Sequence, residues 1–115
     1  MCIFCKIANK ELPSKIEYED EKCMAFYDIN PKAPVHLLII PKKHIENLND
    51  MDESEIGIVA DMALIAKKLA KKLGIDKSGY RVVINNGPDS GQEVYHIHMH
   101  LLGGIFLGSK LFAKI

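Results

Sequence analysis

Three of the five histidines in this chain occupy alternate positions in the stretch YHIHMHLLGG, residues 95–104. Strict alternation predicts a β-strand that carries His96, His98 and His100 on one face and apolar residues on the other. Neighbouring members of such a set lie roughly 6.6 Å apart and the outer pair roughly 13 Å apart, whereas a zinc–nitrogen bond is about 2.0–2.1 Å. Two neighbours could share one metal ion but all three could not, so at least one histidine needs a different role. The ordinary alternative is a polar strand face with hydrogen-bonded histidines.

A glycine-rich loop, NNGPDSGQ, comes directly before this histidine segment. We expect Gly87 and Gly91 to expose backbone N–H groups that bind an anion, as other phosphate-binding loops do. An imidazole beside such a loop can attack a phosphorus atom, while neighbouring imidazoles neutralise the phosphate oxygens and transfer protons. His36, in the stretch VHLLIIPKKH, adds a fourth candidate imidazole from a neighbouring strand. The combination predicts a phosphate site, although a loop of this kind alone is usually a turn.

Length and composition predict a single soluble domain. The chain has 115 residues, 48% of them hydrophobic, and its 15 basic side chains balance 15 acidic ones. Balanced charge gives no general attraction to nucleic acid or to an anionic membrane. No apolar run approaches the length of about 18 residues that a membrane-spanning helix needs, and the N-terminus lacks the pattern of a signal peptide. We therefore expect a cytoplasmic protein whose partners are neither nucleic acids nor membranes.

The three cysteines are too few for a disulfide framework. The spacing Cys2-x-x-Cys5 is typical of a metal-binding or redox pair, and it also occurs in zinc knuckles, where two more ligands complete a tetrahedron. His44, which follows an expected strand, and His96 are candidates for those ligands. The alternative is that the pair consists of two small residues at a frayed terminus. Cys23, in KCMAFYDI, is predicted to be a small buried hydrophobic residue.

The remaining pattern predicts an α+β fold. A long helix is expected over residues 52–74, because Asp52 and Glu55 have capping-box spacing and apolar residues recur at helical intervals. Five mainly antiparallel strands are expected at 16–19, 23–27, 35–41, 80–85 and 96–102, and a short helix at about 4–9. Ile58 and Ile65 widen the apolar stripe of the long helix beyond what one small sheet needs, which predicts a homodimer interface.

The histidine segment HIHMHLL resembles the histidine triad, His-φ-His-φ-His-φ-φ with φ apolar, that defines the HIT superfamily. Three blocks, IFCKI, DINPKAPVHLLIIPKKHI and NNGPDSGQEVYHIHMHLLGG, resemble in order and spacing the Hint branch, the histidine triad nucleotide-binding proteins, of bacterial or archaeal type. The resemblance covers roughly residues 2–104. It implies one HIT domain over residues 1–115, with an unaligned tail at about 105–115. It also implies a HIT-like fold whose five-stranded sheet continues into a ten-stranded sheet across a homodimer.

The resemblance implies an enzyme that binds purine nucleoside monophosphates and hydrolyses phosphoramidates, such as AMP joined to a lysine amine, through a nucleotidyl-histidine intermediate. His98 would be the nucleophile, His100 would contact the α-phosphate, and His36 would support the phosphate side of the site. His96 would complete the catalytic segment. The implied phosphate contacts are Asn85, Gly91, Gln92 and Val94, the implied ribose contact is Asp28, and the implied base pocket is Phe4, Ile7, Leu12, Phe26 and Ile29.

The resemblance also implies a zinc site. Galactose-1-phosphate uridylyltransferases and many bacterial Hint-like proteins of the same superfamily bind zinc through a Cys-x-x-Cys pair, a distant histidine and the first triad histidine. The positions that match this set are Cys2, Cys5, His44 and His96. Such a site would be closed and structural, and it would orient His96 while His98 stays free.

Two features depart from the animal-type Hint proteins. Where those proteins have a serine after the Gly-Gln pair, this chain has Glu93 at the edge of the implied nucleotide site. Its carboxylate would attract a cationic amine leaving group and repel a phosphate oxygen. Those proteins also have a tryptophan near the C-terminus that reaches toward the partner's site, whereas this chain contains no Trp and ends GIFLGSKLFAKI.

Other functions stay open on the sequence alone. A dinucleoside polyphosphate hydrolase of the Fhit type would use the same chemistry with a nucleotide as leaving group. A metal-dependent binding module would use the histidines only as ligands, and a non-catalytic nucleotide-binding protein would bind without turnover. The extended block DINPKAPVHLLIIPKKH favours the Hint branch over the Fhit branch.

Overall fold

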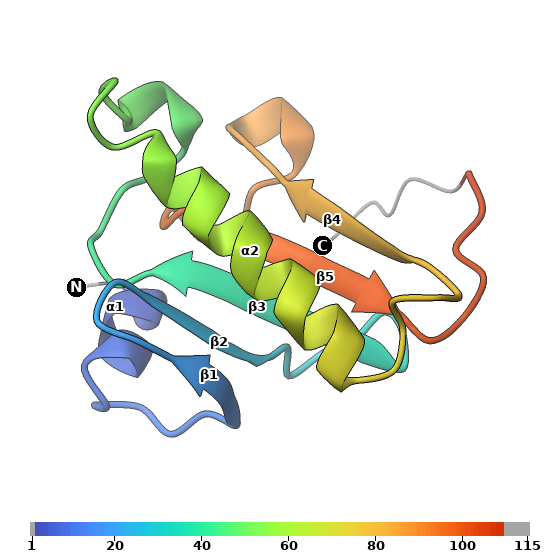
Figure 1. Ribbon diagram of the computed structural model, residues 1–115. Helices are drawn as coiled ribbons and strands as arrows, with labels where there is room; N and C mark the ends of the chain where they lie inside the picture. The colour runs from blue at the N-terminus through green and yellow to red at the C-terminus, as the bar shows by residue number, and fades with distance from the viewer. Residues whose placement is uncertain (1, 110–115) are drawn as a thin grey trace.

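The structure is a computed structural model that describes residues 2–109, so the expected tail at about 105–115 lies partly outside the described residues. Its elements are α1 (Ile3–Ala8), β1 (Ile16–Glu19), β2 (Cys23–Tyr27), β3 (Val35–Pro41), α2 (Gly57–Lys72), β4 (Tyr80–Ile84) and β5 (Met99–Gly103), with short 3-10 turns at Leu48–Asp50 and Pro88–Ser90. The strands form one antiparallel sheet in the order β1-β2-β3-β5-β4 (Figure 1). The predicted α+β fold is confirmed.

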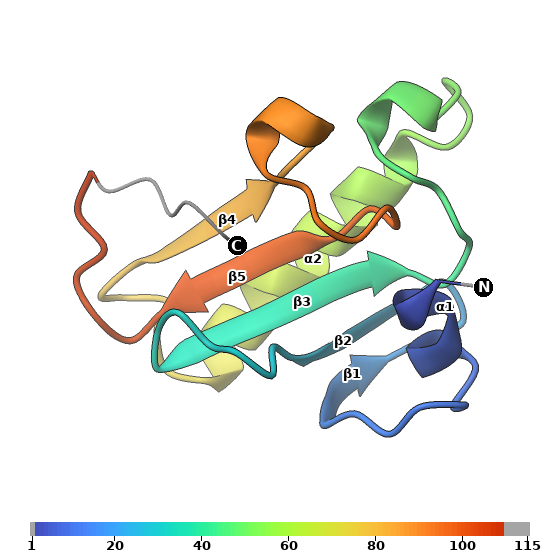
Figure 2. The same ribbon diagram turned by 180° about the vertical axis from the view of Figure 1, so that it is seen from behind.

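The two helices cover opposite faces of the sheet. α2 crosses one face (Figure 1), and α1 lies on the other (Figure 2). Cys23 and Ala25 of β2 belong to the core under α2. Met24 and Phe26, which alternate with them, belong to the apolar cluster around α1. Because both faces of β2 are covered, its sequence is a continuous apolar run rather than an alternating one.

The same alternation places the strand histidines on the α1 face. In β3, Leu37 and Ile39 pack under α2, so His36 and Leu38 point to the opposite face. β5 pairs with β3 in a register that sets His100 opposite Leu38. His36 and His100 are therefore diagonal neighbours on the face that α2 leaves uncovered, within reach of each other's rings.

The histidine strand is shorter than predicted. β5 begins at Met99, so His96 and His98 lie in the segment before it rather than in the strand. The cause is a change of partner: the N–H of Ile97 donates to the carbonyl oxygen of Ile45, in the loop after β3, at 2.7 Å. The backbone before β5 therefore does not take part in the hydrogen-bond ladder of the sheet, but it remains hydrogen-bonded to the loop after β3.

The long helix begins later than its capping box. The N–H of Asp52 donates to Glu55 Oε1 at 3.2 Å, and the N–H of Glu55 donates to Asp52 Oδ1 at 3.1 Å. These reciprocal bonds close a separate turn over residues 53–56, and α2 starts only at Gly57. The helix also ends at Lys72, two residues before the predicted end. The other end corrections are single residues: α1 starts and ends one residue early, β4 ends at Ile84 instead of residue 85, and β5 ends at Gly103 instead of residue 102.

The prediction that Ile65 forms part of a dimer interface on α2 is wrong, because this side chain packs within the chain. Ile65 is only 4% exposed and belongs to the core, and Ile58 packs against that core. α2 lies over both β3 and β5, so the sheet covers a wider part of the helix than a single strand would.

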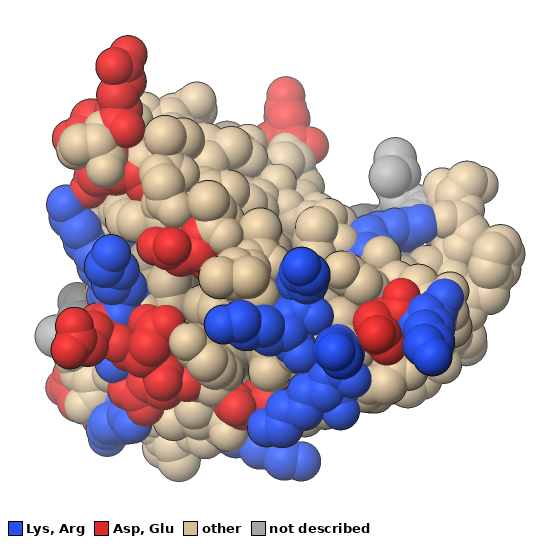
Figure 3. Space-filling view, in the orientation of Figure 1, with Lys and Arg blue, Asp and Glu red and all other residues tan. Residues whose placement is uncertain are grey.

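Charges of both signs are spread over the face of the molecule that carries α2 (Figure 3). Basic side chains gather over the C-terminal half of α2 (Figure 3), where Lys71 and Lys72 complete the last turn and complement the helix dipole. Lys72 Nζ also donates to Glu17 Oε2 of β1 at 2.7 Å, which ties the helix to the edge of the sheet. Within residues 2–109, none of the helices is long and apolar enough to cross a membrane.

Candidate functional site

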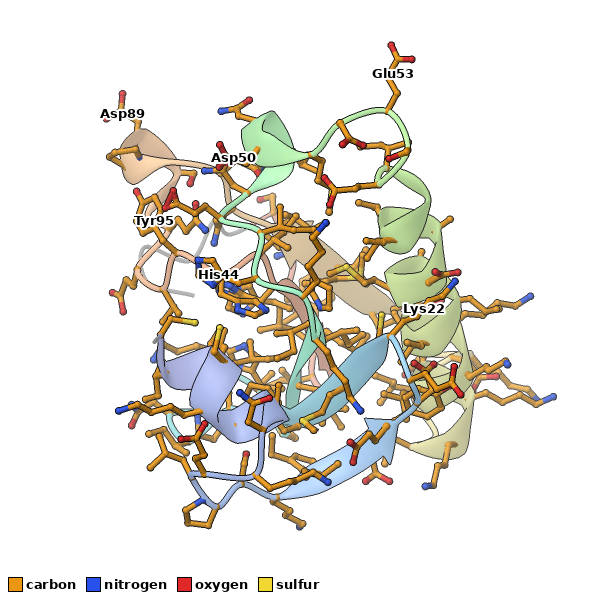
Figure 4. All side chains as sticks on the ribbon, turned by 90° about the vertical axis from the view of Figure 1, so that its left-hand side faces the viewer. Lys22, His44, Asp50, Glu53, Asp89 and Tyr95 are labelled. Carbon is orange, nitrogen blue, oxygen red and sulfur yellow. The ribbon has the colours of Figure 1, made fainter. Side chains whose placement is uncertain are left out.

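Four sulfur and nitrogen atoms meet at the start of α1. Cys2 is the N-cap of this helix and Cys5 lies in its first turn. His44 follows β3 and His96 precedes β5; in Figure 4 the labelled His44 lies between α1 and the loop that carries Tyr95. The two Sγ and two Nδ1 atoms are 3.2–3.5 Å apart in every pairing. Such a tetrahedron has its centre about 2.0–2.1 Å from each corner, close to the lengths of zinc–ligand bonds.

The tautomer of His96 directs a lone pair into this cluster. His96 Nε2 lies 2.7 Å from the carbonyl oxygen of Pro41, which can only accept, so Nε2 carries the hydrogen and Nδ1 faces the sulfur atoms as a lone pair. Burial lowers the pKa of His96 and favours the neutral ring. Burial raises the pKa of the Cys5 thiol, so the thiolate form of Cys5 needs a cation beside it. The cluster can therefore hold a tetrahedral metal ion.

A directional chain of hydrogen bonds joins two more histidines. The backbone N–H of Lys32 donates to His36 Nδ1 at 3.0 Å, so the neutral His36 ring carries its hydrogen on Nε2. His36 Nε2 lies 3.0 Å from His100 Nδ1, which accepts that hydrogen, and His100 consequently carries its own on Nε2. Burial lowers the pKa of His36, and the Asp28 carboxylate, 3.5 Å from His36 Nε2, opposes that shift.

One potential ligand atom from each of Asp28, His36 and His100 lies within 4.8 Å of the other two, a spacing that would also allow a metal ion. The hydrogen on His36 Nε2 occupies the space between the rings, so the three side chains do not present converging lone pairs. We therefore interpret this group as a hydrogen-bonded relay, in contrast to the cysteine–histidine cluster.

His98 presents an imidazole lone pair. Its Nδ1 lies 2.8 Å from the carbonyl oxygen of His96, so Nδ1 is the donor and Nε2 has the free electron pair. Burial lowers the pKa of His98, which keeps the ring neutral. The ring is held edge-on between Phe4, with centroids 5.1 Å apart, and His100, with centroids 4.9 Å apart. A buried, oriented and neutral imidazole of this kind is suited to nucleophilic attack.

His98 opens onto a cleft of about 490 Å³ between α1, the end of β2 with the loop that follows it, and the segment before β5. The predicted site residues that line it are Phe4, Ile7, Phe26, Asp28, Ile29, Glu93, Val94, His98 and His100. The lining residues that the sequence reasoning missed are Pro13, Ser14, Tyr27, Asn30, Lys32 and Leu38. Of these, Leu38 could have been found, because it lies two positions after His36 in a predicted strand and so shares its face.

Other predicted contacts lie away from the cleft lining. Leu12 packs against the apolar cluster around α1, and Gln92 is buried beneath the loop. Asn85 and Gly91 lie in the same connection between β4 and β5 without lining the cleft.

The expectation that two glycines expose their N–H groups to an anion is wrong. The Gly87 N–H donates to Gln92 Oε1 at 2.8 Å, and the Gly91 N–H donates to the carbonyl oxygen of Pro88 at 3.0 Å. Both glycines have positive φ, +87° and +86°, which explains the residue type without a ligand. Glu93 and Val94 follow them and line the cleft, and within the described chain their backbone N–H groups donate no hydrogen bond.

Comparison with known proteins assigns the family. The model of the HIT domain matches residues 9–106, and the chain belongs to this family. A protein named "14 kDa zinc-binding protein" from Zea mays is 54% identical over 104 residues, which cover 89% of this chain and 80% of the relative. A "purine nucleoside phosphoramidase" from Escherichia coli K12 is 47% identical over 112 residues, which cover 97% of this chain and 94% of the relative. The crystal structure of a HIT family hydrolase from Legionella pneumophila superposes with a TM-score of 0.92 at 50% identity, covering 95% and 97%.

Proposed function

We propose that this protein hydrolyses purine nucleoside phosphoramidates, with His98 as the nucleophile that carries the nucleotide between the two half-reactions. The observation that carries the proposal is the Nδ1–H bond from His98 to the carbonyl oxygen of His96, which leaves the Nε2 lone pair at the cleft. The 47% identical relative named purine nucleoside phosphoramidase supports this substrate class.

In the first half-reaction, His98 Nε2 attacks the α-phosphorus and the P–N bond breaks. The leaving nitrogen takes a proton from solvent and departs as the amine. In the second, water attacks the same phosphorus and releases one proton to solvent while the P–Nε2 bond breaks, so that AMP is released and the neutral imidazole is regenerated. His100 contacts the phosphate, and the backbone N–H groups of Glu93 and Val94 supply donors to its oxygens, in the manner of an oxyanion site.

The nucleoside half would occupy the apolar part of the cleft. Phe4 and Phe26, which pack edge to face with centroids 5.4 Å apart, offer walls for a purine ring. Ile29 is 88% exposed at the mouth, and a bound base would cover it. Asp28, whose Oδ1 already accepts the N–H of Asn30 at 2.8 Å, keeps further acceptor capacity for ribose hydroxyls.

The assay of the proposal follows AMP release from an AMP–lysine phosphoramidate, beside a dinucleoside polyphosphate, with and without a chelator. We expect the phosphoramidate to be turned over and its hydrolysis to survive removal of metal from protein that stays folded. Glu93 disfavours the second substrate, because an exposed carboxylate at the cleft repels an anionic leaving group. Activity that disappears with the metal while the fold persists would instead indicate metal-dependent chemistry.

Asp28 is expected to make the site prefer AMP over 2′-deoxy-AMP by roughly 1.5–3 kcal/mol, about 10- to 100-fold in affinity, because the missing hydroxyl leaves a charged acceptor unpaired. Titration calorimetry with both nucleotides measures this ratio. Asp28→Asn should lower the ratio, whereas Glu93→Gln, which neutralises another carboxylate at the same cleft, should not. Equal affinities in the unmodified protein would exclude the ribose role.

We propose that Cys2, Cys5, His44 and His96 hold a structural zinc ion. Two sulfur and two imidazole ligands in a tetrahedron are a typical zinc set, and the maize relative at 54% identity is named for zinc binding. With four protein ligands such an ion has no open position, so its contribution is to cross-link α1 to the segments around β3 and β5. Thiolate ligands of this kind fit a reducing compartment such as the cytoplasm.

We propose that the protein forms a homodimer through the β4 edge of the sheet. Tyr80 and Val82 are 40% and 45% exposed, although their face of β4 continues the apolar face under α2. An apolar edge strand left open invites pairing with another chain, and a two-fold axis closes it.

Light scattering at micromolar concentration should give twice the chain mass of 12.9 kDa. Val82→Lys should give monomers, Glu21→Lys near the opposite edge should not, and a monomeric unmodified protein would refute the proposal.

A further inference from the structure

The side chain of Gln92 lies at the centre of the connection between β4 and β5, and it is only 5% exposed. Its Nε2 donates to the carbonyl oxygens of Glu46 at 2.7 Å and Val94 at 3.1 Å. Its Oε1 accepts the Gly87 N–H at 2.8 Å and Asn47 Nδ2 at 3.3 Å. Both amide hydrogens and both oxygen lone pairs are thus used within the protein, which leaves no atom for a phosphate.

These bonds join two segments that are far apart in the chain. Around Gln92, the N–H of Leu48 donates to Asn86 Oδ1 at 2.9 Å, and the N–H of Ile97 donates to the carbonyl oxygen of Ile45 at 2.7 Å. Residues 45–48, directly after the cluster ligand His44, therefore all bind the connection that leads to the nucleophile segment.

We infer that Gln92 is a positioning residue, which clamps the phosphate-side loop to residues 45–48 without contacting the substrate. The physical reason is that the loop's own hydrogen bonds, from the N–H groups of Ser90 and Gln92 to the Gly87 carbonyl oxygen, fix its internal shape but do not attach it to residues 45–48. Gly87 and Gly91 both have positive φ, and the residues between them are exposed. Removal of the amide would take a hydrogen-bond partner from four polar groups at once, of which the one on Asn47 belongs to a buried residue. Glu93, which follows, would then no longer hold its N–H at a defined place in the cleft. The link to phosphate rests on the proposed function, whereas the clamp itself does not.

Amide hydrogen exchange in the ligand-free protein tests the clamp directly. We expect Gln92→Ala to speed amide exchange at Gly87 and Ile97 by about tenfold or more. The loss of a hydrogen bond with a net free energy near 1.4 kcal/mol corresponds to an about tenfold faster exchange rate. Asp89→Ala, an exposed change in the same loop (Figure 4), should leave both amides unchanged. A side chain that served only to contact phosphate would not alter exchange without ligand, so unchanged protection in Gln92→Ala overturns the inference.

A double-mutant cycle, measured by AMP affinity, gives a second test of the clamp. It includes a variant that is milder than Gln92→Ala. Asn47, which does not line the cleft, is the partner that donates to Gln92 Oε1 from a side chain. We expect Gln92→Ala to weaken AMP binding about tenfold and Asn47→Ala by a smaller factor, with the double variant no more than about twofold weaker than Gln92→Ala alone. Additive losses would show that Gln92 acts independently of the clamp and would overturn the inference. If AMP did not bind the unmodified protein, the proposed function would fail, and hydrogen exchange would still decide the clamp.

Discussion

Replacement of His98 by asparagine is expected to remove nearly all phosphoramidate turnover while AMP binding is largely kept. Among the described residues that line the cleft, the His98 imidazole is the only one for which the hydrogen-bond pattern assigns a free lone pair, on Nε2, to an oriented, neutral ring. Loss of a nucleophile typically costs several orders of magnitude in rate. Binding should persist because it uses the apolar walls around Phe4 and Phe26 and the carboxylate of Asp28, none of which changes.

Two measurements separate chemistry from binding in this variant. Single-turnover kinetics with an AMP–amine substrate gives the rate, and titration calorimetry with AMP gives the affinity. Mass spectrometry of acid-quenched protein should detect an added nucleotidyl group on the unmodified chain and none on His98→Asn. If the variant kept even a tenth of the turnover, the covalent mechanism would be contradicted. If the variant lost AMP affinity to the same extent as turnover, the substitution would have disrupted the fold of the cleft rather than removed the nucleophile alone.

Replacement of Cys5 by serine is expected to remove about one zinc ion per chain together with a large part of the thermal stability. A structural zinc site contributes its binding free energy to folding, and loss of a few kcal/mol lowers the melting temperature of a domain of this size by about 10 °C or more. The effect should be large here because the cluster joins α1 to the loop after β3 and to the segment before β5. Metal content by mass spectrometry and melting by circular dichroism measure the two losses.

The third cysteine supplies the matched control. Cys23 is fully buried in the core under α2, and burial raises its pKa to about 11, as expected for an inert thiol. Cys23→Ala should lower stability through lost packing but keep the zinc content unchanged. Metal-free protein that folds and turns over substrate normally, even with zinc added, would end the proposal of a zinc site.

Those features that depend on local pattern could be predicted from the sequence. The bounds of β1, β2 and β3 agree with the prediction, because apolar and β-branched runs end at turn residues within a few positions. The three alternate histidines and the Cys-x-x-Cys pair are also local, and their spacing limits the chemistry that they can perform. One metal ion cannot bind all three triad histidines, and this restriction follows from backbone geometry alone.

Tertiary structure decided everything that depends on partners far apart in the chain. The carbonyl oxygen of Pro41 selects the tautomer of His96 across 55 positions of the chain, and His36 contacts His100 across 64 positions, so no local pattern specifies these contacts. The N–H of Ile97 finds a partner outside the sheet, which shortens β5, and the Gly87 N–H is used by Gln92 instead of an anion. A sequence pattern shows which groups can donate or accept, but a hydrogen bond is chosen by distance in space, and only the packed sheet and its two helices bring these groups together.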